Sequence, residues 1–106
     1  MTVHSDLCED ICDYLKSLGA WFYRPNSHGY GRKGIPDILV CYRGQFIGIE
    51  VKVAPDDVTP WQRRELFGDG EGYVGITTAQ GSALIVYKLE DVRKFFELKF
   101  KSRDVS

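Results

Sequence analysis

The chain has 106 residues, a formal net charge of −1 at pH 7 and 43% hydrophobic residues. This length allows one domain with a hydrophobic core but no second large domain, so we expect a single domain over residues 1–106. A nearly neutral net charge does not by itself indicate a polyanionic partner. No apolar run is long enough to span a membrane, and the first ten residues are acidic where a secretory signal is basic, which predicts a soluble, cytoplasmic protein.

The distribution of charge is more informative than its sum. Residues 1–19 hold four acidic residues and one basic residue, whereas residues 20–35 hold three basic residues and no acidic one. Residues 93–103 hold five basic residues and a single acidic one. Two basic segments therefore flank the middle of the chain, where they are able to contact an anion.

The first element is predicted to be a helix over residues 6–18. Ser5 or Asp6 is a suitable N-cap, and Gly19 suits the position after the helix end. Glu9 lies on the polar face, three residues after Asp6, in the spacing of a capping box. A structural role and a chemical role for Glu9 are both open at this point. The apolar residues at helical spacing are Leu7, Ile11, Tyr14, Leu15 and Leu18.

The three cysteines, Cys8, Cys12 and Cys41, are an odd number without a Cys-x-x-Cys spacing, which favours reduced thiols over a disulfide framework. His4, Cys8 and Cys12 are four residues apart and so share one helix face. A zinc site there needs a fourth ligand that the sequence does not visibly supply, so buried apolar cysteines are the favoured interpretation.

A short predicted strand at residues 20–24 is followed by a loop that is rich in glycine and basic residues. Glycines in such a loop let the backbone approach a ligand closely, and basic side chains meet phosphates. A tyrosine in the loop is able to stack on a base. An ordinary surface loop is the competing interpretation. The predicted nucleic-acid contacts in and around this loop are Arg24, His28, Tyr30, Arg32 and Lys33.

Residues 38–42 and 46–51 are β-branched or aromatic runs separated by residues 43–45, which predicts a hairpin. An antiparallel partner brings Asp37 close to Glu50, and strand alternation places Glu50 and Lys52 on one face. Two converging carboxylates repel each other unless a cation or a proton lies between them. Hard oxygen ligands suit Mg²⁺ or Mn²⁺ better than Zn²⁺, so a metal site is predicted here.

The rest of the chain is predicted to complete an α/β domain. Thr59 is a good N-cap for a helix over residues 59–67, and Gln62 completes a Thr-x-x-Gln capping box. Arg63 follows on the same helix as a further candidate phosphate contact. Strands at 73–77 and 83–87 would make a mixed sheet of about five strands, and a helix at 90–100 either covers the core or contributes to a dimer contact.

The pairing of Pro36-Asp37 with Glu50-Val51-Lys52 resembles the PD-(D/E)xK nuclease superfamily, and more narrowly a stand-alone VRR-NUC domain. Three further features resemble that narrower family: Glu9 on the first helix, the run Gly31-Arg32-Lys33-Gly34, and Gln62 at the start of a helix. The resemblance covers about residues 5–90.

The resemblance implies a restriction-endonuclease-like sheet flanked by helices and Mg²⁺- or Mn²⁺-dependent hydrolysis of DNA. It implies metal ligands at Asp37, Glu50, the main-chain carbonyl of Val51, and Glu9, with Gln62 beside the acids. Lys52 is expected to act chiefly as a cation rather than as a general base, because two carboxylates favour its charged form.

For the substrate, the resemblance implies four-way DNA junctions that a homodimer resolves. A less selective endonuclease or nickase of the same fold, and a catalytically silent DNA-binding module, are the alternatives. A buried salt-bridge cluster in a purely structural domain is a third interpretation of the same residues. No P-loop or Gly-x-Gly-x-x-Gly pattern is present, so no nucleotide cofactor is expected.

Overall fold

A computed structural model describes residues 2–25 and 31–100 of the chain. The elements in chain order are α1 (Val3–Leu18), β1 (Trp21–Tyr23), β2 (Ile38–Tyr42), β3 (Gln45–Val51), α2 (Pro60–Phe67), β4 (Ser82–Val86) and α3 (Leu89–Phe100).

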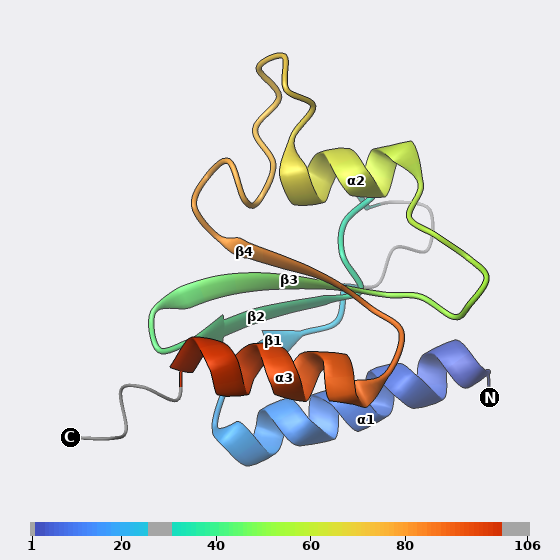
Figure 1. Ribbon diagram of the computed structural model, residues 1–106, viewed down its shortest axis with the longest axis vertical. Coiled ribbons are helices and arrows are strands. Elements are labelled where there is room, and N and C mark those ends of the chain that lie inside the picture. Colours follow the sequence, from blue (N-terminus) through green and yellow to red (C-terminus); the bar gives the residue numbers. More distant parts are fainter. Residues whose placement is uncertain (1, 26–30, 101–106) are drawn as a thin grey trace.

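The strands form one mixed sheet in the order β1-β2-β3-β4. The first three strands are antiparallel, whereas β3 and β4 are parallel and are joined by a crossover through α2. Helices α1 and α3 lie side by side against one face of the sheet, and α2 lies on the opposite side (Figure 1). One face of β2 and β3, which flank the predicted metal site, therefore packs against α1 and α3.

Helix α1 begins earlier than predicted. Thr2 is its N-cap, and Thr2 and Ser5 form a reciprocal capping box. The predicted capping by Ser5 or Asp6, with Glu9 completing the box, is therefore wrong. The helix ends at Leu18 with Gly19 as its C-cap, as predicted. The extra turn carries His4 into the helix, one turn before the buried Cys8.

The hydrophobic core lies between the sheet and the pair α1 and α3. Alternate residues of β2 and β3 point into it, as expected for strands that are covered on this face. The aromatic side chains of α3 pack on Tyr42 of β2, so α3 covers the core. The buried members are Cys8, Ile11, Leu15, Ile38, Val40, Ile47, Ile49, Val51, Val86, Val92, Phe96 and Phe100.

The predicted hairpin between β2 and β3 is present. Its turn consists of Arg43 and Gly44, both with positive φ (51° and 79°), which is the combination that a two-residue type I′ turn requires. Gln45, predicted in the loop, instead pairs with Tyr42 as the first residue of β3.

Among the described residues the sheet has four strands rather than about five, because residues 73–77 do not join it. The N–H groups of Ile76 and Thr77 donate to the carbonyls of Glu65 and Leu66 at the end of α2. The N–H of Gly75 donates to the Thr78 hydroxyl. These local partners satisfy the backbone that a strand would have paired across the sheet.

Within residues 2–25 and 31–100, no helix is both long enough and apolar enough to cross a membrane.

Candidate active site

Asp37 and Glu50 meet where β2 begins and β3 ends. The antiparallel register pairs Ile38 with Ile49, so the preceding residue Asp37 lies beside Glu50 on the neighbouring strand. The Oδ2 atom of Asp37 accepts a hydrogen bond from the Val51 N–H at 2.9 Å. The side chain of Asp37 is thus anchored to β3 itself, as the hairpin predicts.

Glu50 is the most unusual carboxyl group in the described structure. It is only 2% exposed, and its Oε1 atom has no hydrogen-bond partner among the described residues. Burial first and the Asp37 carboxylate second raise the pKa of Glu50 to about 8, against a smaller lowering effect of Lys52. A divalent cation between these acids would offset both the burial of the Glu50 charge and its repulsion by Asp37. The oxygen atoms of the two carboxyl groups are therefore suitable ligands for a metal ion.

Lys52 stands next to this acid pair. Its Nζ atom lies 3.8 Å from Glu50 Oε2, and its side chain is 14% exposed. The alternation of β3 places both side chains on the same side of the strand, as the sequence predicts. A basic side chain is therefore held at the edge of the acid pair and is largely sheltered from water.

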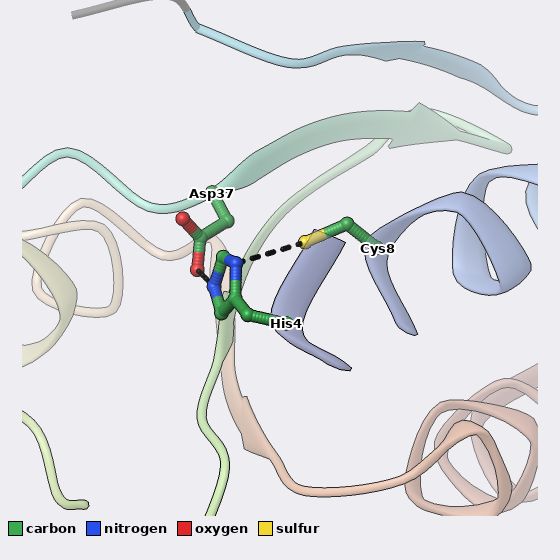
Figure 2. A group of neighbouring side chains, drawn as sticks. All are labelled: His4, Cys8 and Asp37. Atoms are coloured by element: carbon green, nitrogen blue, oxygen red, sulfur yellow. Dashed lines mark hydrogen bonds and ion pairs between the residues drawn. The ribbon is translucent and has the colours of Figure 1, made fainter. Parts of the chain in front are cut away.

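His4 is a member of the site that the sequence did not predict. Its Nε2 atom lies 3.2 Å from Asp37 Oδ2 and 3.1 Å from the Val51 carbonyl oxygen. Figure 2 shows the imidazole ring between Asp37 on one side and Cys8 on the other. The Sγ atom of Cys8 lies 4.0 Å from His4 Nδ1.

One sequence signal pointed toward these residues. His4 and Cys8 are four residues apart and share a helix face with Cys12. From the sequence alone, buried apolar cysteines are favoured over a metal site on this face. The ligand atoms of His4, Cys8 and Asp37 lie within 4.8 Å of one another, and within the described residues Cys12 is not part of that group. The third member, Asp37, directly precedes β2 and lies 29 positions after Cys8 in the sequence, which helix spacing alone does not reveal.

Glu9, the predicted acid of α1, is exposed on the helix. Within residues 2–25 and 31–100, the group whose ligand atoms lie within 4.8 Å of one another is His4, Cys8 and Asp37, and it includes neither Glu9 nor Glu50. The structure therefore brings Asp37, Glu50, Val51 and Lys52 together, and His4 of α1 contacts Asp37 and the Val51 carbonyl.

Gln62 performs the capping role that its spacing predicts. Its side-chain Oε1 atom accepts from the Thr59 N–H at 2.9 Å, and its backbone N–H donates to Thr59 Oγ1 at 3.1 Å. Gln62 also lines a cavity of about 530 Å³ that reaches Asp37. The other lining residues are Pro25, Gly31, Arg32, Lys33, Gly34, Ile35 and Pro36.

Gly34 brings the basic loop against the start of α2. Its φ is +85°, and a Cβ atom placed there would lie 2.5 Å from the carbonyl oxygen of Trp61. Only glycine fits this close approach without displacing backbone. The sequence predicted that glycines of this loop let the backbone approach a ligand. At Gly34 the backbone instead approaches Trp61 of the protein itself.

The predicted nucleic-acid contacts differ in their surroundings. Arg32 is engaged internally: its Nε and Nη2 atoms donate to the carboxylate of Glu65 at 3.1 and 3.0 Å, and Nη2 also donates to Tyr73 Oη. Lys33 Nζ lies 5.2 Å from the ring centroid of Trp61. Arg24 and Arg63 are exposed, and His28 and Tyr30 lie outside the described residues.

Glu65 is a buried acid that the sequence did not single out. It is 7% exposed, and it accepts from Arg32 and from the hydroxyl of Tyr73. Both of its carboxylate oxygens have hydrogen-bond partners, whereas Glu50 has Lys52 at 3.8 Å from Oε2 and no described partner at Oε1. This contrast separates a structural carboxylate from one with an unused oxygen.

A mixed sheet with helices on both sides, and with Asp37, Glu50 and Lys52 at the end of a central hairpin, has a restriction-endonuclease-like α/β architecture. A solved structure described as a VRR_NUC domain is similar to this chain. The TM-score is 0.72 at 24% sequence identity, over 94% of this chain and 100% of that one. The chain therefore has the fold of a VRR_NUC domain.

No protein-family model matches the chain, and no curated protein matches it.

Proposed function

We propose that the chain is a metal-dependent DNA endonuclease that hydrolyses phosphodiester bonds. The observation that carries this proposal is the buried Glu50 carboxyl group, whose Oε1 atom has no partner in the described part of the chain although Asp37 lies beside it. A purely structural cluster would pair both oxygens, as Glu65 does with Arg32 and Tyr73. The shared VRR_NUC fold supports the same class of reaction.

The residues that would hold the cation are Asp37, Glu50 and the main-chain carbonyl of Val51. All three supply oxygen atoms, which are the donors that Mg²⁺ and Mn²⁺ prefer. A bound divalent cation supplies charge neutralisation on the phosphoryl oxygens and a more acidic water. Glu9 is exposed, and a role for it as an accessory ligand stays a prediction.

Lys52 would contribute a positive charge beside the acid pair. Its ammonium group, 3.8 Å from Glu50, is placed to orient the attacking water and to offset negative charge that develops in the transition state. Gln62 uses its carbonyl oxygen for capping. Its amide nitrogen is the atom left for a role beside the acids.

The DNA backbone would approach along the cavity that Lys33, Gly34 and Gln62 line next to Asp37. Arg24 and Arg63 are exposed and suited to phosphate contacts. His28 and Tyr30 complete the proposed contacts from the sequence. Arg32 donates to Glu65 and Tyr73 through two of its nitrogens, so its remaining N–H groups are those available to a phosphate.

Branched DNA is the proposed substrate and a homodimer the proposed assembly. One sheet face supports a second copy as partner: Trp21, Cys41 and Phe46 are cross-strand neighbours on β1, β2 and β3 and are all exposed. Trp21 is 60% exposed and Tyr23, on the same face of β1, is 53% exposed. A C₂ dimer over this apolar face would pair two active sites, as symmetric nicking of a junction requires.

The substrate test offers labelled four-way junction, flap, linear duplex and single strand to the purified protein, each with Mg²⁺, with Mn²⁺ and with chelator. We expect cleavage of the junction that chelator abolishes. Equal cleavage of all duplex substrates would contradict junction selectivity and support a less selective endonuclease. Binding of DNA with no cleavage under any condition would replace the enzyme with a DNA-binding module.

A further inference from the structure

His4 of α1 lies against the proposed metal site, and the role assigned to it below rests on the proposed function. The Nε2 atom of His4 lies 3.2 Å from Asp37 Oδ2 and 3.1 Å from the Val51 carbonyl oxygen. These two oxygens belong to two of the three groups that would hold the cation. One imidazole nitrogen therefore lies within hydrogen-bond distance of two proposed metal ligands, of which Figure 2 shows Asp37.

The imidazole ring of His4 is held in place by neighbouring residues of α1. His4 is fixed in the first turns of α1 by the Thr2 and Ser5 capping box. Its Nδ1 atom faces the Sγ atom of Cys8 at 4.0 Å, and Cys8 is fully buried. A thiol is both a weak donor and a weak acceptor, so Cys8 can support the ring with the proton on either nitrogen. Nε2 is then able to present its lone pair to a cation.

A Cys8–His4–Asp37 chain also resembles a nucleophile, a base and an orienting acid. Cys8 is 0% exposed, so no substrate atom reaches its sulfur. Its Sγ atom faces His4 Nδ1 at 4.0 Å, whereas the Asp37 and Val51 oxygens lie against Nε2, the other ring nitrogen. Cys8 is therefore a positioning residue behind the imidazole.

We propose that His4 supplies a nitrogen ligand to the cation held by Asp37, Glu50 and the Val51 carbonyl, and that this nitrogen makes the site prefer Mn²⁺ to Mg²⁺. Mg²⁺ takes oxygen donors and keeps its waters, whereas imidazole suits transition metals. An all-oxygen site would lack this discrimination. His4 is thus a determinant of metal specificity.

The test measures metal binding to the full chain without DNA, by titration calorimetry with Mn²⁺ and separately with Mg²⁺. We expect wild type to bind Mn²⁺ at least tenfold more tightly than Mg²⁺. In His4→Glu, which restores an oxygen donor, that ratio should fall several-fold while Mg²⁺ binding persists. Cys8→Ser should keep the wild-type preference, since the sulfur is not a ligand. Melting curves establish that each variant is folded.

A spectroscopic readout separates direct ligation from an indirect effect. Electron spin echo modulation from ¹⁴N on bound Mn²⁺ should be present in wild type and absent in His4→Glu. The chain has only two histidines, so His28→Gln is the matched control and should keep the modulation. Modulation that survives in His4→Glu, or an unchanged preference in that variant, overturns the proposal for His4.

These outcomes are distinguishable from failure of the proposed function. If Asp37→Ala loses both metals while His4→Glu changes nothing, the metal-dependent nuclease stands and the role of His4 is overturned. If wild type binds neither ion and cleaves DNA in chelator, both proposals are overturned. Loss of Mn²⁺ binding in Cys8→Ser, in a folded variant, would make the sulfur a ligand and overturn the assigned donor set.

Discussion

At the scale of single residues, the two acids of the site differ in how well their carboxyl oxygens are paired. Asp37 accepts from the Val51 N–H and lies beside His4, whereas Glu50 is buried with an unpartnered oxygen. The free energy of holding Glu50 ionised is therefore unfavourable in the absence of a cation. This cost is the physical basis for expecting both metal binding and a pH-dependent stability.

The stability of the metal-free protein should fall as pH rises from about 5 to about 8. The pKa of Glu50 is about 8 in the folded chain and near 4.5 when unperturbed, so the native state binds more protons than the unfolded state in this window. Urea unfolding in chelator at pH 5.5 and 8.5 measures the effect. In Glu50→Gln the decline should shrink by at least about 1 kcal/mol. Equal slopes in the two proteins would contradict the shift.

Lys52→Ala should retain metal and DNA binding but lose cleavage about 100- to 1,000-fold, because a fixed charge near the transition state is removed. Asp37→Ala should lose metal binding as well. Single-turnover cleavage and calorimetry measure the two properties. Lys94→Ala, an exposed lysine on α3, is the matched control. Undiminished turnover in Lys52→Ala would remove Lys52 from the mechanism.

At the scale of elements, α2 is positioned by its first turn. Thr59 and Gln62 cap it, and Gly34 packs against the Trp61 carbonyl. Lys33 and Arg64 lie over the Trp61 ring, at 5.2 and 4.7 Å from its centroid. The start of α2 and the basic loop are thus one unit beside the cavity that reaches Asp37.

The two roles of Gln62 are separable because Glu is equally suited to a capping box. Gln62→Glu should keep the free energy of unfolding within about 0.5 kcal/mol, whereas Gln62→Ala should lose about 1 kcal/mol. If the amide nitrogen serves the site, Gln62→Glu loses cleavage in spite of its stability. Full activity in a stable Gln62→Glu protein would limit Gln62 to capping.

Gly34→Ala should destabilise the chain more than Gly70→Ala. Both glycines have positive φ, +85° and +76°, which costs an alanine roughly 1–2 kcal/mol. A Cβ atom added at Gly34 would also lie 2.5 Å from the Trp61 carbonyl oxygen, whereas one added at Gly70 would meet nothing within 4 Å. Urea unfolding of both variants isolates the contact with α2. Equal losses would show that the approach of the loop to Trp61 contributes nothing.

At the scale of the whole molecule, the two faces of the sheet differ. Helices α1 and α3 cover one face, whereas α2 and its neighbouring loop cover only the β3 and β4 side of the other (Figure 1). The β1 and β2 side of that second face carries the exposed Trp21 and Tyr23. Exposed aromatic residues in one row are typical of a surface that another chain covers.

Trp21→Lys should therefore convert the proposed dimer into a monomer. Light scattering of wild type, with and without junction DNA, should give twice the chain mass, and the variant should give the chain mass. Leu98→Lys is the matched control, since Leu98 is 72% exposed on α3 but lies on the opposite side of the sheet. A monomeric wild type in the presence of junction DNA would contradict the dimer.

The features that the sequence by itself determined are local ones. The hairpin that joins Asp37 to Glu50, the position of Lys52 on the same strand face, and the Thr59-x-x-Gln62 capping box all depend on neighbours within about fourteen positions. Strand alternation and capping geometry are the same wherever such segments occur. These parts of the fold and site were therefore predictable.

Only the tertiary structure decided the partners that come from distant segments. His4 meets Asp37 across 33 positions, and Arg32 meets Glu65 across the same separation. Thr2, Ser5 and Asp6 all suit an N-cap, and the choice of Thr2 is what carries His4 into α1. Local propensity does not select among such near-equal caps, nor does it state which side chain a helix face will meet.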